Sequence, residues 1–149
     1  MGAMKKTLMW AVGIFLVIQL VPFGHTHTNP PVTGEPQWDS QLTSDLVHRA
    51  CYNCHSNQTT WPWYSNIAPV SWLTQRDVNG GRRHLNFTEW NQTQKHAKDV
   101  AAEVKSGDMP PWFYLPMHPE AKLTDQDRLA LIAGAAKTLG PQEEKQEKH

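Results

Sequence analysis

The segment Cys51-Tyr52-Asn53-Cys54-His55 contains the residues of this chain that are best suited to chemistry. It has the form C-x-x-C-H, which is the attachment signature of c-type haem. Two thiols at this spacing can each form a thioether with a haem vinyl group, and the histidine that follows can reach the iron as its proximal ligand. The segment therefore predicts one covalent haem c on Cys51 and Cys54, with His55 as an iron ligand.

Two other kinds of site use a C-x-x-C pair, and the sequence argues against both. A zinc site needs further ligands at a similar spacing, but the chain has two cysteines in all. A redox dithiol of the thioredoxin type follows a strand and opens a helix, whereas the residues before Cys51 predict a helix that ends at the motif. A thiol oxidoreductase that uses Cys51 and Cys54 is therefore the least favoured hypothesis.

A second iron ligand is expected from a loop after the motif, as in cytochromes that coordinate iron through His and Met. Met109 follows Gly107 and precedes Pro110-Pro111, and a stiff loop can hold a weak thioether ligand in place. We predict that Met109 is the distal ligand. Met117 and His118 lie in a second proline-rich loop and are the alternatives.

The propionate groups of a haem are anions, and Arg82 and Arg83 offer planar guanidinium groups suited to carboxylates. Hydrogen bonds to the same groups are also expected from the indole N–H groups of Trp61 and Trp63 and from the hydroxyl of Tyr64. The alternatives are a solvated basic pair for the arginines and core packing for the aromatic residues.

The N-terminal residues indicate export. Lys5 and Lys6 precede an apolar run from Leu8 to Val21 that is interrupted by Gln19. This order is typical of a signal sequence, and no small-x-small cleavage site follows it. We expect residues 1–28 to form an uncleaved anchor helix that holds the protein in the membrane on the periplasmic side of the bacterial inner membrane. The alternative is a cleaved signal peptide and a soluble periplasmic protein.

The remaining length and charge limit what the protein can be. Residues 29–140 leave room for one small domain, and residues 141–149 form a charged tail that we expect to be disordered. The formal net charge is zero and no basic stripe is present, which argues against nucleic acid as a partner. The same neutral balance gives no patch to steer a redox partner, and the sequence identifies none.

Four helices are expected to position the motif, and no strand pattern is present. Start and stop residues place them at about 39–50, at 70–81 with Gly80-Gly81 as the stop, at 88–107 with Thr88 as the N-cap, and at 124–140 with a capping box of Thr124 and Asp127. Apolar stripes predict their buried faces. For the first and last helices these stripes are Leu42, Leu46, Val47 and Ala50, and Leu129, Ile132, Ala136 and Leu139.

Several blocks of this chain resemble the bacterial haem-binding domain family, which consists of small exported proteins with one C-x-x-C-H motif. The blocks are Cys-Tyr-Asn-Cys-His-Ser-Asn at 51–57, Trp-Pro-Trp-Tyr at 61–64, Ile-Ala-Pro-Val-Ser-Trp at 67–72, Arg-Arg-His-Leu-Asn-Phe at 82–87 and Met-Pro-Pro-Trp at 109–112. The resemblance covers about 29–140 and implies an all-α, cytochrome c-like fold around one covalent haem. It implies no defined physiological role.

Two further hypotheses on function follow from the iron coordination. Ligation by His55 and Met109 predicts an electron carrier rather than an enzyme. The alternative is a five-coordinate haem enzyme or sensor that handles peroxide or binds a small gas. Such a protein needs a polar residue beside the open coordination position, for which His118 and His84 are the candidates.

Overall fold

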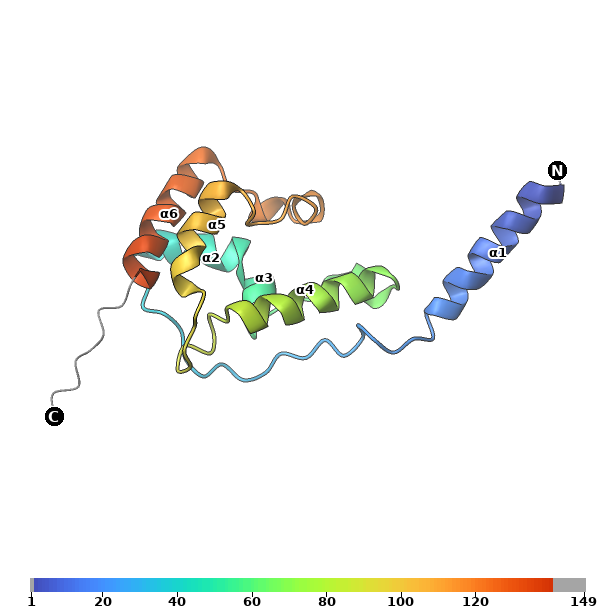
Figure 1. Ribbon diagram of the computed structural model, residues 1–149, viewed down its shortest axis with the longest axis horizontal. Coiled ribbons are helices and arrows are strands. Elements are labelled where there is room, and N and C mark those ends of the chain that lie inside the picture. The colour runs from blue at the N-terminus through green and yellow to red at the C-terminus, as the bar shows by residue number, and fades with distance from the viewer. Residues whose placement is uncertain (1, 141–149) are drawn as a thin grey trace.

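The computed structural model describes residues 2–140, and the predicted tail at 141–149 lies outside this range. The described chain is helical and forms no β-strand, which confirms the predicted all-α class (Figure 1). Its α-helices are α1 (Gly2–Ile18), α2 (Gln41–Ala50), α3 (Tyr52–His55), α4 (Val70–His84), α5 (Val100–Ser106) and α6 (Asp125–Leu139). Short 3-10 helices are η1 (Trp63–Asn66), η2 (Ala97–Asp99), η3 (Leu115–Met117) and η4 (Pro119–Ala121).

Helix α1 stands apart from the other helices and buries none of its residues (Figure 1). It has 17 residues. Among the described residues, no helix combines the length and the apolar character needed to cross a membrane. The predicted membrane anchor is therefore not supported.

Helix α2 begins and ends where the sequence predicts. The Ser40 hydroxyl accepts a hydrogen bond from the backbone N–H of Thr43 at 3.2 Å, which caps the first turn. Leu46 and Val47 are buried as predicted, whereas Leu42 is 55 % exposed. The single turn of α3 follows directly and carries the C-x-x-C-H motif.

Helix α4 is longer than predicted, because it continues through Gly80-Gly81 to His84. Glycine in a helix interior costs about 1 kcal/mol relative to alanine, so a tertiary contact must require it. A Cβ atom at position 81 would overlap the backbone carbonyl of Cys54. Gly81 therefore lets α4 pass directly against α3, and the prediction that the glycine pair ends the helix is wrong.

The predicted helix start at Thr88 is also wrong, because α5 begins at Val100 after η2. The Thr88 side chain is fully buried. Its hydroxyl accepts from the backbone N–H of Asn57 at 2.7 Å and donates to Asn86 Oδ1 at 2.8 Å. The Thr88 hydroxyl therefore bonds to Asn57, which is distant in the chain, and to the nearby Asn86, and it does not cap a helix. The end of α5 at Gly107, which has a φ of 87°, is as predicted.

The capping box of α6 is confirmed, with Thr124 and Asp127 each accepting from the other's backbone N–H at 3.1 Å. The predicted buried stripe is wrong in part, because Leu129 is 68 % exposed and Ala136 is also exposed. The reason is the contact with α2: a Cβ at Gly134 would collide with the Thr43 side chain, so the helices touch along the Gly134 face. The buried residues of α6 are Leu131, Gly134, Ala135 and Leu139.

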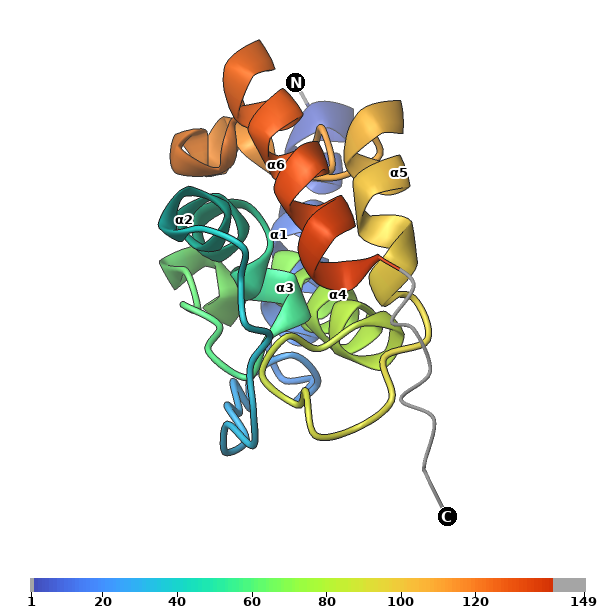
Figure 2. The same ribbon diagram turned by 90° about the vertical axis from the view of Figure 1, so that its left-hand side faces the viewer.

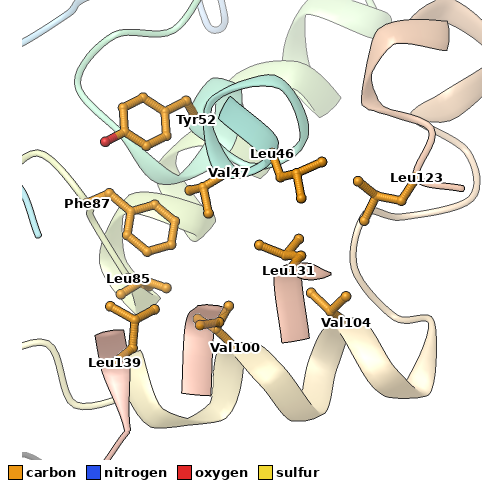
Figure 3. Close-up of a cluster of buried hydrophobic side chains, with 11 residues drawn as sticks. Leu46, Val47, Tyr52, Leu85, Phe87, Val100, Val104, Leu123, Leu131 and Leu139 are labelled. Carbon is orange, nitrogen blue, oxygen red and sulfur yellow. The ribbon is translucent and has the colours of Figure 1, made fainter. Parts of the chain in front are cut away.

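The hydrophobic core lies where α2, α5 and α6 meet. Helices α5 and α6 run side by side, with α2 beside α6 (Figure 2). Figure 3 shows side chains from these helices, from α3, and from the segments after α4 and before α6 gathered in one cluster. The labelled members are Leu46, Val47, Tyr52, Leu85, Phe87, Val100, Val104, Leu123, Leu131 and Leu139. This cluster fixes the helices around the C-x-x-C-H turn.

An extended segment follows α1 and runs along α4 (Figure 1). We call residues Gln19–Asn29 the N-terminal strap. The Gln19 side chain exchanges two hydrogen bonds with the backbone of Ala68, at 2.9 and 3.0 Å. His27 stacks on Trp61 with ring centroids 4.5 Å apart, and its Nε2 lies 3.0 Å from the carbonyl oxygen of Ser65. The strap is therefore packed against the helical domain.

Candidate cofactor site

The C-x-x-C-H turn lines a cavity of about 710 Å³, here called the motif cavity. Cofactor pockets span roughly 300–1,000 Å³. Its walls come from α3, α4, the segment after α4, α5 and the loop that follows α5. Among its lining residues are Cys51, Cys54, His55 and Met109, so the structure brings the predicted attachment and ligand residues to one cavity.

The imidazole of His55 is oriented by the protein backbone. Its Nδ1 lies 3.1 Å from the carbonyl oxygen of Leu85. A carbonyl can only accept, so Nδ1 carries the hydrogen and Nε2 is the ring nitrogen that can bind a metal. Burial lowers the pKa of His55, which favours the neutral imidazole that metal ligation requires.

The two cysteines have unpaired thiols. Burial raises the pKa of the Cys51 thiol to about 12, and the neighbouring Cys54 adds to the rise. Burial also raises the pKa of Cys54 to about 11. Redox dithiols work through a thiol with a lowered pKa, so this environment argues against the oxidoreductase hypothesis.

The three predicted candidates for the distal ligand lie in different places. Met109 is half-buried in the motif cavity, where its backbone N–H donates to the Glu103 carbonyl at 3.2 Å. Met117 is 56 % exposed and lines a different cavity. Both ring nitrogens of His118 are engaged, Nε2 with the Tyr64 hydroxyl at 2.5 Å and Nδ1 with Glu120 Oε1 at 2.9 Å. The geometry favours Met109.

The two predicted arginines separate. Arg82 does not line the motif cavity, because its guanidinium donates to the carbonyls of Ser56 and Thr28, at 2.7 and 2.9 Å. It also donates to the side chains of Asn29 and Thr59 at 2.9 Å each. Arg82 thus ties the strap to the loop after the motif.

Arg83 does line the motif cavity, together with Arg76, which the sequence analysis missed. The two are seven residues apart on α4, a spacing that places them on one helix face. This spacing is the signal that could have identified Arg76. Both guanidinium groups are available to carboxylates of a ligand in the cavity.

The predicted aromatic residues also separate. Trp61 stacks on His27 of the strap and does not line the motif cavity. Trp63 and Tyr64 line an adjoining cavity of about 660 Å³, here called the aromatic cavity. No sequence pattern predicted a role for Asn53, whose side chain donates to the Tyr114 hydroxyl at 2.7 Å. This contact joins the motif to the loop after Met109.

The residues of the motif cavity fit a haem. They combine two protonated thiols, a neutral imidazole with one nitrogen available and a thioether sulfur. Within residues 2–140, no group of three or more His, Cys, Asp or Glu side chains is arranged to hold a bare metal ion. Apolar walls suit a macrocycle instead, and they are formed by Leu85, Phe87, Val100 and Val104.

Comparisons with known proteins agree with this geometry. No curated protein and no solved structure matches the chain. The family model described as the haem-binding domain matches residues 13–137, which include the motif cavity and the strap. The chain therefore belongs to the haem-binding domain family and binds haem.

Proposed function

We propose that this protein is a monohaem c-type cytochrome that transfers electrons. Its haem is attached to Cys51 and Cys54, and its iron is ligated by His55 and Met109. The observation that carries the proposal is the presence of all four side chains in one cavity, with His55 Nδ1 already hydrogen-bonded to the Leu85 carbonyl. A bound haem supplies a one-electron ferric–ferrous couple.

In this proposal the residues of the cavity have distinct roles. Leu85 fixes the His55 ring through its carbonyl group. Phe87 and Val104 exclude water, and the half-buried Met109 thioether occupies the second ligand position. Arg76 and Arg83 bind the propionates. The helices around the cavity then form a cytochrome c-like fold.

The alternative, an open-iron enzyme or sensor, has less support. His118 was a candidate polar residue for it, but both its ring nitrogens are hydrogen-bonded and it does not line the motif cavity. His84 lines the cavity but is exposed at the end of α4. Met109 in the cavity favours a closed, six-coordinate iron.

The distal ligand is tested by Met109→Leu, with Met117→Leu as the matched control. Absorption spectra of the haem-loaded protein are recorded in both redox states, with and without carbon monoxide. We expect Met109→Leu to lose the weak long-wavelength ferric band of Met ligation and to bind carbon monoxide readily. Met117→Leu should keep the wild-type spectrum. Ready carbon monoxide binding by the wild type would establish the open-iron alternative instead.

The proposal includes export to the periplasmic side of the inner membrane. The basic residues Lys5 and Lys6 before the apolar residues of α1 support it. Fractionation of a bacterial host, followed by haem staining of a denaturing gel, tests both export and covalent attachment. Haem that remains with the polypeptide in the periplasmic or membrane fraction is expected, whereas a haem-free cytoplasmic chain would contradict the proposal.

A further inference from the structure

The aromatic cavity lies between α4, η1 and the loop at 113–118. The two cavities are continuous, because five residues line both of them: Asn53, Cys54, Asp77, Phe113 and Tyr114. Cys51, His55 and Met109 do not line the aromatic cavity. A haem held by those three residues, as proposed above, occupies the motif cavity. Tyr64 and His118 do not line the motif cavity, so the part of the aromatic cavity around them is left to a different ligand.

The walls of the aromatic cavity suit a flat, neutral molecule. Trp63, Phe113 and Tyr114 supply ring surfaces, and Val70 and Leu73 supply aliphatic ones. Aromatic rings pack well against such walls. Among residues 2–140, no Lys or Arg lines this cavity, and Asp77 is its one carboxylate. An anionic ligand would therefore find no cationic partner there.

A chain of hydrogen bonds through Glu120, His118 and Tyr64 ends at the aromatic cavity. His118 Nδ1 lies 2.9 Å from Glu120 Oε1, and His118 Nε2 lies 2.5 Å from the Tyr64 hydroxyl. Hydrogen bonds from its own backbone N–H and from His118 hold the pKa of Glu120 below its usual value, so the carboxylate is ionised and accepts. In its neutral form His118 therefore carries its hydrogen on Nδ1, facing Glu120, and accepts at Nε2.

The hydrogen of the Tyr64 hydroxyl consequently points to His118. Burial raises the pKa of Tyr64, so the hydroxyl keeps this hydrogen. The buried ring of His118 is held by stacking on Tyr114, with centroids 3.9 Å apart. The Tyr64 oxygen retains a lone pair and offers the cavity a hydrogen-bond acceptor of fixed position.

We propose that the aromatic cavity binds a neutral aromatic alcohol of the phenol or hydroquinone class, whose hydroxyl donates a hydrogen bond to the Tyr64 oxygen. The site lies beyond the haem ligands and adds a small-molecule ligand to the proposed electron carrier. A methyl ether of the same ring system has the same flat surface but no donor. The alcohol should therefore bind more tightly than its ether.

The test compares 1-naphthol with 1-methoxynaphthalene by titration calorimetry on the full-length, haem-loaded protein. We expect 1-naphthol to bind at one site with an affinity about three- to tenfold higher than that of the ether, as one hydrogen bond predicts. Tyr64→Phe removes the acceptor oxygen but frees the lone pair of His118 Nε2, so the test variant combines it with His118→Phe and should abolish the preference. His118→Phe alone keeps the Tyr64 oxygen and should keep the preference. Equal affinities in the wild type, no binding at all, or a preference that survives the double variant would overturn the proposal.

A second pair of variants locates the site. Leu73→Trp places a larger side chain at the cavity wall and should weaken the binding of both compounds, whereas Leu129→Trp on the exposed face of α6 should change neither. Unchanged binding by Leu73→Trp would place the compounds elsewhere and overturn the proposal. Covalent haem is measured on every preparation, so a haem-free protein with a Tyr64-dependent preference would reject the cytochrome and retain this site.

Discussion

The side chain of Arg82 is the clearest case in which hydrogen bonds determine the role of a residue. Its four acceptors come from the strap and from the loop after the motif. Its neighbour Arg83 is exposed and lines the motif cavity. Two adjacent arginines on one helix therefore have different surroundings: Arg82 is hydrogen-bonded to the strap and the loop, and Arg83 lies at the motif cavity.

We expect Arg82→Gln to lower the free energy of unfolding by about 2–3 kcal/mol, because it leaves the Ser56 and Thr28 carbonyls without a charged donor. Lys105→Gln, which removes an exposed positive charge on α5, is the control and should change it by less than about 0.5 kcal/mol. Chemical denaturation of both variants measures the difference. Equal effects would show that Arg82 does not hold the strap.

Helix α6 shows how much of an element is set by local sequence. The capping box at Thr124 satisfies backbone N–H groups that the first turn leaves unpaired. We expect Thr124→Ala to lower the free energy of unfolding by about 1 kcal/mol. Gln126→Ala in the same turn should change it by less than about 0.5 kcal/mol. Thermal melts followed by circular dichroism compare the two, and an intact Tm in Thr124→Ala would refute the role of the cap.

The same turn gives a dependence on pH. The backbone N–H of Thr124 and then the Arg49 guanidinium, 2.6 Å from Asp127, hold the pKa of Asp127 below its usual 3.8. A lowered pKa in the folded state stabilises the fold above the usual pKa, and this contribution is lost as the pH falls through the folded-state pKa. Asp127→Asn should therefore destabilise the protein at pH 7 and have little effect at about pH 2.5.

Denaturation of Asp127→Asn and of the wild type at both pH values measures this change. Asp125→Asn, in the same turn of α6, is the control for loss of a negative charge near the helix N-terminus. A difference between Asp127→Asn and the wild type that persists unchanged in acid would contradict the assignment to the ionised carboxylate.

At the scale of the whole molecule, the strap joins α1 to the helical domain. Gln19 lies 49 residues before Ala68 in the chain, and its amide group pairs with both backbone groups of that fully buried residue. The family match begins at residue 13, before the strap. The segment after α1 thus lies within the residues that the family model matches and belongs to the packed structure.

We expect Gln19→Ala to lower the free energy of unfolding by about 1–2 kcal/mol, because the N–H of Ala68 loses its acceptor. Leu20→Ala is the control, since Leu20 is 82 % exposed, and it should change this energy by less than about 0.5 kcal/mol. Limited proteolysis provides a second readout, with faster cleavage within 19–29 expected in Gln19→Ala. Equal cleavage of the two variants would argue that the strap is held elsewhere.

Some features of this protein follow from the sequence because they depend on residues close together in the chain. The chemistry of Cys51 to His55 needs only their spacing, and the caps at Ser40 and Thr124 act within one helical turn. The all-α class follows in the same way from start, stop and periodicity signals. These local signals also predicted the family, which the match over 13–137 confirms.

Other features were decided by contacts between residues distant in the chain. Thr88 has the residue type of a helix N-cap, but its hydroxyl accepts a hydrogen bond from the distant Asn57. Gly81 has the residue type of a helix stop, but it lies inside α4 where the helix packs closely against Cys54. Met109 and Met117 both lie in stiff loops, but only packing determines which of them lines the motif cavity. Residue type and local spacing determine which chemistry a side chain can perform. Its burial and its tertiary contacts determine which of several suitable side chains lies at the site.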